Sequence, residues 1–208
     1  MYDLFNPAPD NLDNVPSINK GVDLSPIRGL RYVPNFITRK EELDLLTLIN
    51  DEPWLNDLKR RVQHYGYKYD YRSRSLNYAM YLGDLPSWSD PFTRRMYDKG
   101  FIEETADQLI VNEYLPGQGI ANHIDCQPCF GETILSLSLG STCLMDFVHV
   151  ESKRIISLLL EPRSLLIMSN DARHKWTHGI GGRKSDEYSG KSFPRETRVS
   201  LTFRKVIF

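Results

Sequence analysis

The sequence lacks long apolar runs: no stretch of about 18 apolar residues occurs, so we expect no membrane-spanning helix. The opening residues, MYDLFNPAPD, hold neither a basic nor an apolar stretch, which argues against a secretory signal peptide. Cysteine is scarce, and its odd number, three, argues against a secreted disulfide framework and favours a reducing compartment. We therefore expect an intracellular, cytoplasmic protein with no membrane partner.

A strong net charge is also missing. The formal net charge is −1, so the composition as a whole gives no sign of a polyanionic partner. The segment 59–74, KRRVQHYGYKYDYRSR, departs from this average with six Lys or Arg, one Asp and four interleaved tyrosines. Such a segment can face phosphates and stack bases. The alternative, which the segment alone favours, is a strand with a solvated basic face and tyrosines packed on the core.

The first half of the chain contains few regular elements. Residues 1–26 are rich in Pro, Asn and Asp without apolar periodicity, which predicts an extended arm before a single domain over 27–208. The segment 38–51 opens with Thr38 and Glu41, the pattern of a capping box, and continues with helical spacing. The segment 90–100 predicts a second short helix with Asp90 as its N-cap.

The second half of the chain contains seven short runs rich in β-branched and aromatic residues, separated by turn signals. Without helices between them, the runs cannot form a parallel α/β sheet. We expect an α+β fold in which an antiparallel sandwich or jelly roll is braced by the N-terminal helices. The runs are QLIVNEYL (108–115), ETILSLSL (132–139), TCLMDFVH (142–149), RIISLLLE (154–161), SLLIMS (164–169), KWTHGI (175–180) and TRVSLTFRKV (197–206).

Two metal-binding patterns overlap in NHIDCQPCF, residues 122–130. On a strand, His123 and Asp125 project to the same side. With His178 from a later strand they would form the two-histidine, one-carboxylate triad of non-haem iron oxygenases. Taken alone, His178 is better explained as a hydrogen-bonded core histidine. Cys126 and Cys129 form C-x-x-C, but a structural zinc site needs further ligands, and a thioredoxin-like site needs a βαβ context. We interpret them as free loop thiols.

The last run places two arginines on one face of a strand. Arg198 and Arg204 alternate with the apolar residues of that strand, which would face the core. Two buried guanidinium groups are costly without an anion, and the arginine fork suits a carboxylate such as the distal one of 2-oxoglutarate. The alternative is a solvent-exposed edge strand.

Together these motifs resemble the AlkB family of Fe(II)- and 2-oxoglutarate-dependent dioxygenases, over roughly residues 30–206. The resemblance rests on the order and spacing of N-x-Y-x-P-G (112–117), H-x-D (123–125), H-G-I (178–180) and R-x-x-L-T-F-R (198–204). It implies a double-stranded β-helix that uses Fe(II), 2-oxoglutarate and O2. It also implies that His123, Asp125 and His178 form the catalytic iron site and that 2-oxoglutarate contacts Asn112, Tyr114, Arg198 and Arg204.

The resemblance also implies a nucleic-acid substrate. The G-Y-x-Y at 66–69 resembles the nucleotide-recognition segment of the family, so the expected substrate contacts are Tyr67, Tyr69, Gln127 and Arg173. Gln127 stands where AlkB has an acidic residue, which departs from the preference for methylated adenine. Ser200 stands where AlkB has Asn, on the cosubstrate side.

We expect a monomeric demethylase of alkylated bases in DNA or RNA, of the DNA-repair type, that prefers single strands. The alternatives are a hydroxylase of a modified tRNA wobble uridine, because SLSLGSTCLMDF and ARHKWTHGI look closest to that subgroup, and an oxygenase of a small metabolite. A binder of alkylated nucleic acid without catalysis and a zinc hydrolase with the same three ligands are further alternatives.

Overall fold

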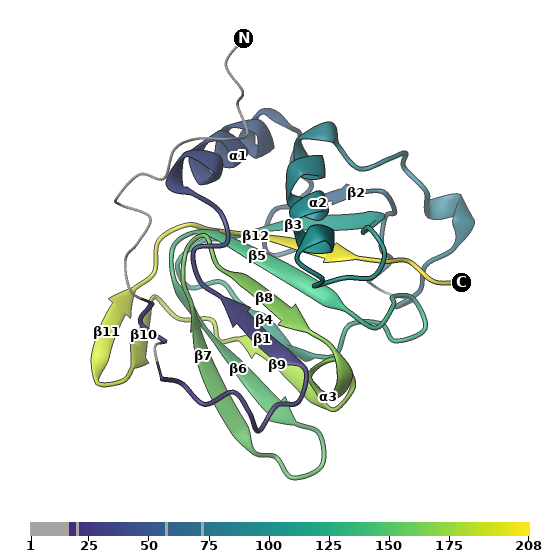
Figure 1. Cartoon of the computed structure of the whole chain (residues 1–208). Helices are drawn as coiled ribbons and strands as arrows, with labels where there is room; N and C mark the ends of the chain where they lie inside the picture. Colours follow the sequence, from purple (N-terminus) through teal and green to yellow (C-terminus); the bar gives the residue numbers. More distant parts are fainter. Residues whose placement is uncertain (1–16, 20, 57, 72) are drawn as a thin grey trace.

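The computed structural model describes residues 17–19, 21–56, 58–71 and 73–208. Its centre is a pair of antiparallel sheets that form a jelly roll, as the sequence predicts (Figure 1). The six-stranded sheet has the order β1 (Leu30–Val33), β8 (Leu165–Met168), β5 (Ile134–Gly140), β12 (Arg198–Arg204), β3 (Gln108–Tyr114) and β2 (Val62–Tyr65). The four-stranded sheet has the order β4 (Ile120–His123), β9 (Trp176–Ile180), β6 (Cys143–His149) and β7 (Ile155–Leu160). A separate hairpin joins β10 (Ser185–Tyr188) and β11 (Lys191–Pro194).

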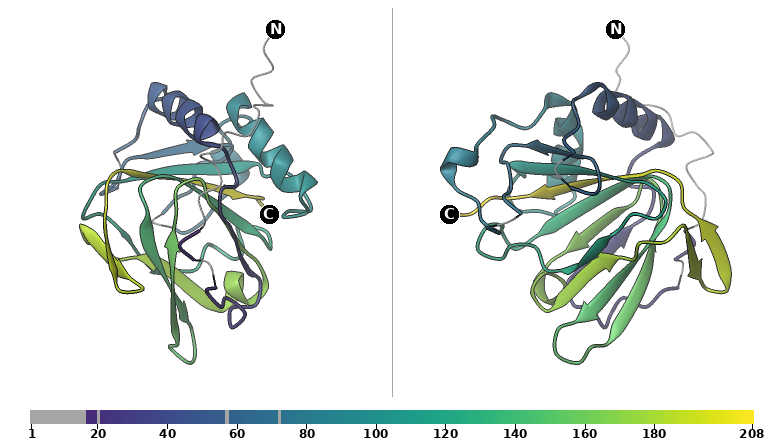
Figure 2. Two further views of the ribbon diagram at one scale, coloured as in Figure 1. Left: turned by 60° about the vertical axis from the view of Figure 1, so that its left-hand side comes forward. Right: turned by 180° about the vertical axis from the view of Figure 1, so that it is seen from behind.

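Two helices, α1 (Arg39–Asp51) and α2 (Asp90–Asp98), lie over the outer face of the six-stranded sheet, and Figure 2 shows the same layering from other directions. The capping box at the start of α1 is confirmed: Thr38 accepts a hydrogen bond from the backbone of Glu41, whose side chain accepts one in return. The N-cap of α2 is Ser89 and not Asp90, which is the first helical residue. The prediction was therefore one residue late, because Ser89 also ends the 3-10 turn Ser87–Ser89.

The two faces of strand β12 carry different side chains. Val199, Leu201 and Phe203 are buried in the core that also contains residues of both helices. Arg198 and Arg204 project to the opposite side, between the two sheets, with 3% and 8% of their surface exposed. The predicted alternation is confirmed, and the alternative of an exposed edge strand is wrong because β12 pairs with both β3 and β5.

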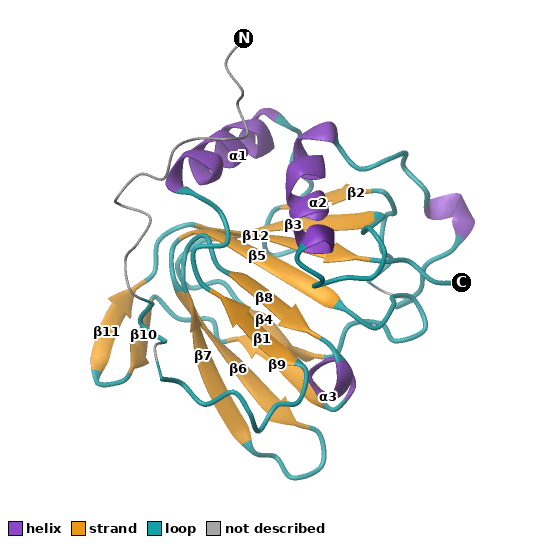
Figure 3. Ribbon diagram, in the orientation of Figure 1, coloured by secondary structure: helices purple, strands orange, loops and turns teal. Residues whose placement is uncertain are grey.

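All seven predicted strands are present, but shorter elements were missed (Figure 3). The segment 165–180 contains a one-turn helix, α3 (Asn170–His174), where the sequence indicated a turn. Part of the basic segment is the strand β2, followed by irregular chain and a 3-10 turn at Tyr78–Met80. The strand β2 agrees with the alternative that the sequence favoured for 59–74. The missed strands β1, β4, β10 and β11 have four residues each, too few for a period-two pattern to stand out, whereas the equally short β8 lies in a continuous apolar run.

The predicted N-terminal arm lies mostly outside the described residues, and the division of the chain at residue 26 stays a prediction. Within residues 17–19 and 21–26 there is no helix or strand. Asn19 anchors this stretch, because its side-chain amide donates to the backbone of Leu159 at 2.6 Å and to Glu161 at 3.1 Å. None of the helices in the described ranges is long and apolar enough to span a membrane.

Candidate metal centre

Three residues from the four-stranded sheet and the loop beside it could hold a metal ion. His123 ends β4 and lies opposite His178 of β9, with ring centroids 4.5 Å apart. Asp125 follows two residues after His123, and its Oδ1 lies 3.7 Å from His123 Nε2. One ligand atom of each residue lies within 4.8 Å of the others. Because β4 ends at His123, Asp125 belongs to a loop and not to the strand that the H-x-D spacing suggested.

The protonation of this cluster suits a divalent cation. His123 Nδ1 donates to the Ala121 carbonyl at 2.9 Å, which leaves Nε2 available as a ligand. Burial lowers the pKa of His178 to about 3, so its imidazole is neutral at neutral pH. Burial alone would raise the pKa of Asp125, but the charge of Arg204, then His178 and His123, holds that pKa well below its ordinary value.

An unsatisfied carboxylate oxygen completes the fit to a metal. Asp125 Oδ1 accepts a hydrogen bond from Arg204 at 3.1 Å. Its Oδ2 is buried and, within the described residues, has no hydrogen-bond partner. A buried carboxylate oxygen without a donor is costly unless a cation binds it. The donor set of two imidazoles and one carboxylate therefore fits Fe(II).

Beside the metal cluster, the cavity has the features of an anion site. Arg198 Nη2 donates to Ser138 Oγ at 2.9 Å, and Arg204 Nη1 donates to Gln108 Oε1 at 3.0 Å. The Nε atoms of both arginines are buried and, in the part of the chain that the structure describes, have no acceptor. Buried donors of this kind call for an anion.

The predicted cosubstrate residues meet in this cavity. Tyr114 pairs with Arg198 and Asn112 with Ser200 across the β3–β12 ladder. All four line one cavity of about 660 Å³ between the sheets, together with the metal cluster. A site for a cation and a site for a carboxylate therefore share one space.

Of the predicted substrate contacts, only Tyr69 lines this cavity, where Tyr71 and Arg74 lie near it. Tyr67 packs against Tyr81, with ring centroids 5.0 Å apart, and against Phe208. Gln127 is exposed in the loop after Asp125, with its amide nitrogen 3.5 Å from the His174 carbonyl. The structure thus brings Tyr69 to the cavity and places Tyr67 and Gln127 outside its lining.

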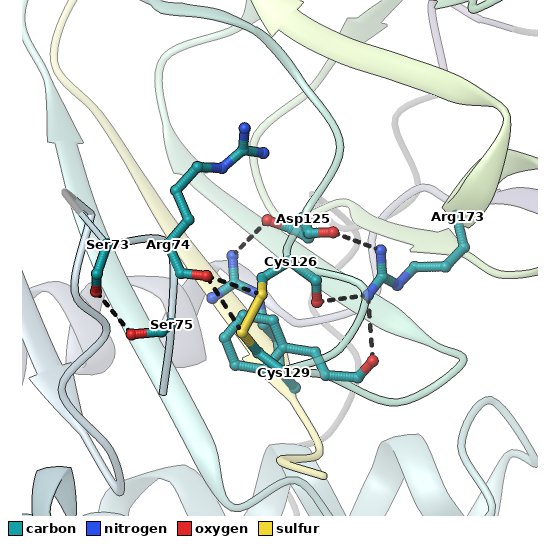
Figure 4. The surroundings of a disulfide bond; sticks show 9 residues. Ser73, Arg74, Ser75, Asp125, Cys126, Cys129 and Arg173 are labelled. Carbon is teal, nitrogen blue, oxygen red and sulfur yellow. Dashed lines mark hydrogen bonds and ion pairs between the residues drawn. A yellow bond between two sulfur atoms is a disulfide. The ribbon is translucent and has the colours of Figure 1, made fainter. Parts of the chain in front are cut away.

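Arg173, an expected substrate contact, is buried against the loop that carries Asp125. It is 3% exposed, and its guanidinium donates to the backbone carbonyls of Asp125 at 2.8 Å and Cys126 at 3.1 Å (Figure 4). It also donates to the carbonyls of Phe130 at 3.2 Å and Gly131 at 3.3 Å. Four hydrogen bonds from Arg173 are thereby directed into the loop 125–131. Arg173 thus anchors the loop that carries Asp125, and its contact with a substrate stays a prediction.

The two cysteines of that loop are a correction. Cys126 and Cys129 form a disulfide rather than free thiols, because the tight turn of the loop brings their Cα atoms to 5.3 Å (Figure 4). The disulfide faces the backbone carbonyl of Arg74, whose side chain points away from it. Cys143 is the free, buried cysteine. The cytoplasmic localisation stays a prediction.

Sequence reasoning missed two further residues, Gln108 behind Arg204 and Arg60 in the cavity wall. Gln108 begins β3 opposite Arg204 and supplies its acceptor. Arg60 lines the cavity from the chain that precedes β2. The role of Gln108 follows only from the pairing of β3 with β12. Arg60 was overlooked because the segment 59–74 was considered only for contacts with nucleic acid or as an exposed strand.

Comparisons with known proteins agree with a site for Fe(II) and 2-oxoglutarate. The sequence pattern of the 2OG-Fe(II) oxygenase superfamily matches residues 49–204. A zebrafish (Danio rerio) protein named "Probable RNA/DNA demethylase ALKBH6" is 33% identical, with 84% of each chain covered. A Xenopus tropicalis protein named "tRNA (carboxymethyluridine(34)-5-O)-methyltransferase alkbh8" is 38% identical over 86% of this chain, but the chain spans only 32% of that relative. The structure of OsALKBH1 superposes with a TM-score of 0.65 at 19% identity, covering 85% of this chain and 96% of that chain, and shows the shared fold.

Proposed function

The chain belongs to the AlkB family of 2OG-Fe(II) oxygenases, and from this premise we propose that it oxidatively demethylates alkylated nucleobases in DNA or RNA. It is an oxidoreductase that uses Fe(II), 2-oxoglutarate and O2. When bound, iron would activate O2, the oxidant: one oxygen atom would enter 2-oxoglutarate, which is oxidised to succinate and CO2, and the other would hydroxylate a substrate C–H bond. A hydroxylated N-methyl group then leaves as formaldehyde and the base is restored.

In this proposal the protein positions the reactants. His123, Asp125 and His178 hold Fe(II), and Arg198, Arg204, Asn112 and Tyr114 hold 2-oxoglutarate. The observation that carries the assignment is one cavity containing both a carboxylate oxygen that needs a cation and buried guanidinium donors that need an anion. Because burial raises the pKa of Tyr114, its phenol stays protonated and can donate a hydrogen bond.

The substrate base would enter past Tyr69 and Tyr71, which line the same cavity as the metal cluster. Aromatic faces bind a base that has left its stack, and Arg74 at the same wall can face the phosphates. Extruding a base costs least in a single strand, so we propose a single-stranded substrate acted on by a monomer. The name of the zebrafish relative supports a nucleic-acid demethylase.

A hydroxylase of a modified tRNA wobble uridine is the second candidate. It is favoured by the higher identity, 38%, to a part of the Xenopus protein whose printed name describes a tRNA methyltransferase. The two activities differ in their products: a hydroxylated uridine keeps its new oxygen, whereas an N-methyl group is lost.

The test is mass spectrometry of nucleosides after incubation of the iron-loaded protein with 2-oxoglutarate, O2 and single-stranded DNA or RNA carrying 1-methyladenine or 3-methylcytosine. We expect unmethylated bases from the wild type and none from His178→Ala. Hydroxylated uridine in tRNA, without demethylation of either oligonucleotide, would replace the proposal with the second candidate. Turnover without 2-oxoglutarate would favour a zinc hydrolase, and binding without any turnover a non-catalytic binder.

A further inference from the structure

Arg60 belongs to the basic segment 59–74, but its side chain turns inward. Its Nε donates to Asn112 Oδ1 at 2.8 Å, and its guanidinium carbon lies 5.4 Å from the centre of the Tyr114 ring. Asn112 and Tyr114 project from β3 to the same side of the sheet, and Arg60 lines the cavity with both. A residue expected to face a nucleic-acid backbone therefore contacts two residues of the cosubstrate wall.

These contacts decide what Asn112 and Tyr114 can offer a ligand. With Oδ1 of Asn112 occupied by Arg60, the amide NH2 group is the part left for the cavity, and that group is a donor. The ring of Tyr114 lies between two guanidinium groups, because Arg198 is also 5.4 Å from its centre. Cations on an aromatic face are attracted to it, so this arrangement fixes the ring. Both side chains are then set to donate hydrogen bonds to an anion.

We propose that Arg60 is a positioning residue for 2-oxoglutarate: it orients the Asn112 amide and the Tyr114 ring as donors to the cosubstrate. The inference rests on the proposed contacts of Asn112 and Tyr114 with 2-oxoglutarate. It also adds a third positive charge, beside Arg198 and Arg204, to a cavity that must hold a dianion. Arg60 thus acts on cosubstrate affinity and not on the nucleic acid.

Arg61 provides a matched control. It is the next residue in the same basic segment and carries the same charge, but it makes a two-pronged ion pair with Glu113, with distances of 2.8 and 2.5 Å. Glu113 projects from β3 to the side opposite Asn112, away from the cavity. Replacing Arg61 removes one positive charge from the segment without touching the cosubstrate wall.

The experiment measures 2-oxoglutarate binding by calorimetry to the Fe(II)-loaded full chain without oxygen, so that no turnover occurs. We expect Arg60→Met to weaken binding about tenfold, the loss typical of a hydrogen bond with a charged partner. Arg60→Lys, which keeps the charge and a donor, weakens it less, and Arg61→Met leaves it unchanged. In steady-state assays, Arg60→Met raises KM for 2-oxoglutarate but changes neither kcat nor KM for the oligonucleotide.

Several outcomes would overturn the inference. A raised KM for the oligonucleotide with unchanged 2-oxoglutarate binding would make Arg60 a phosphate contact. Equal losses in Arg60→Met and Arg61→Met would show a general charge effect instead of positioning. If Arg60→Met does not fold, Arg60→Gln replaces it, and wild-type affinity in that variant would contradict the inference. Failure of the wild type to bind 2-oxoglutarate would instead contradict the proposed function.

Discussion

Arg204 Nη2 lies 3.1 Å from Asp125 Oδ1, so a guanidinium of the anion side of the cavity holds the carboxylate of the metal side. Both side chains are less than one-tenth exposed. In the proposed site, Arg204 therefore contacts an iron-binding residue, Asp125, and its remaining donors face the cosubstrate. Replacing Arg204 should lower both the free energy of unfolding and the affinity for 2-oxoglutarate.

Arg204→Met should destabilise the iron-free protein by about 3–5 kcal/mol, because it leaves the Asp125 carboxylate buried without its partner. The matched variant is Arg198→Met, which removes a hydrogen bond to the neutral Ser138 hydroxyl and a cation–π contact with Tyr114 and should cost about 1–2 kcal/mol. Urea unfolding with a chelator present measures both. Equal losses in the two variants would show that the Asp125 pair does not stabilise the fold.

The free energy of unfolding of the iron-free protein should fall as the pH falls below the ordinary His178 pKa of 6.5. Because the folded pKa is about 3, the unfolded chain binds a proton in this window that the folded chain does not bind. The contribution of His178 is about 1.4 kcal/mol per pH unit well below 6.5. The free energy of unfolding keeps falling with this slope until the pH approaches the pKa of His178 in the folded protein.

Denaturant titrations of wild type and His178→Gln between about pH 7 and 4.5 isolate this slope, because the variant lacks the titrating group. The low pKa of Asp125 adds its own loss only at lower pH, below the ordinary value for an aspartate. Parallel slopes in the two proteins would mean that His178 is not the group responsible.

Iron should stabilise the protein, and removing it with a chelator should lower the thermal unfolding temperature, because a metal that binds only the folded state adds its binding energy to folding. Asp125→Asn should bind iron weakly and lose this response. Gln127→Ala lies two residues away in the same loop, is exposed, and should keep it. A full iron response in Asp125→Asn would remove Asp125 from the ligand set.

Arg173→Met should lower the free energy of unfolding by several kcal/mol, on the order of 3, because three buried carbonyls and one part-buried carbonyl lose their donor. It should also weaken iron binding, since the loop that carries Asp125 loses its anchor. KM for the oligonucleotide should not change. A raised KM with intact stability would instead support the substrate contact of Arg173 that the sequence suggested.

Much of the fold could be predicted because its information is local. The capping box of α1 and the alternation along Arg198–Arg204 are encoded in neighbouring residues, and so are the seven runs that form the predicted strands. The strand β4 was missed because Ile120–His123 is short and carries no alternation of its own. His123 and Asp125 were nevertheless predicted as a pair, although Asp125 is positioned by a loop and not by a strand.

The roles of the long cationic side chains could not be predicted from patterns in neighbouring residues. Arg173, Arg60 and Arg61 each reach partners 42 or more residues away in the sequence. Whether such a side chain faces solvent, a phosphate or a buried acceptor depends on the tertiary fold. Likewise, the spacing of Cys126 and Cys129 permits a disulfide but requires a turn that only the folded loop supplies.

The most direct test counts products: succinate and formaldehyde released by the iron-loaded protein with 2-oxoglutarate, O2 and a single-stranded oligonucleotide carrying 1-methyladenine. We expect one formaldehyde for each succinate, and neither product without the methylated base, without iron, or in His178→Ala. Succinate formed at the same rate with and without the methylated oligonucleotide, and no formaldehyde, would contradict the claim that this cavity oxidises alkylated bases.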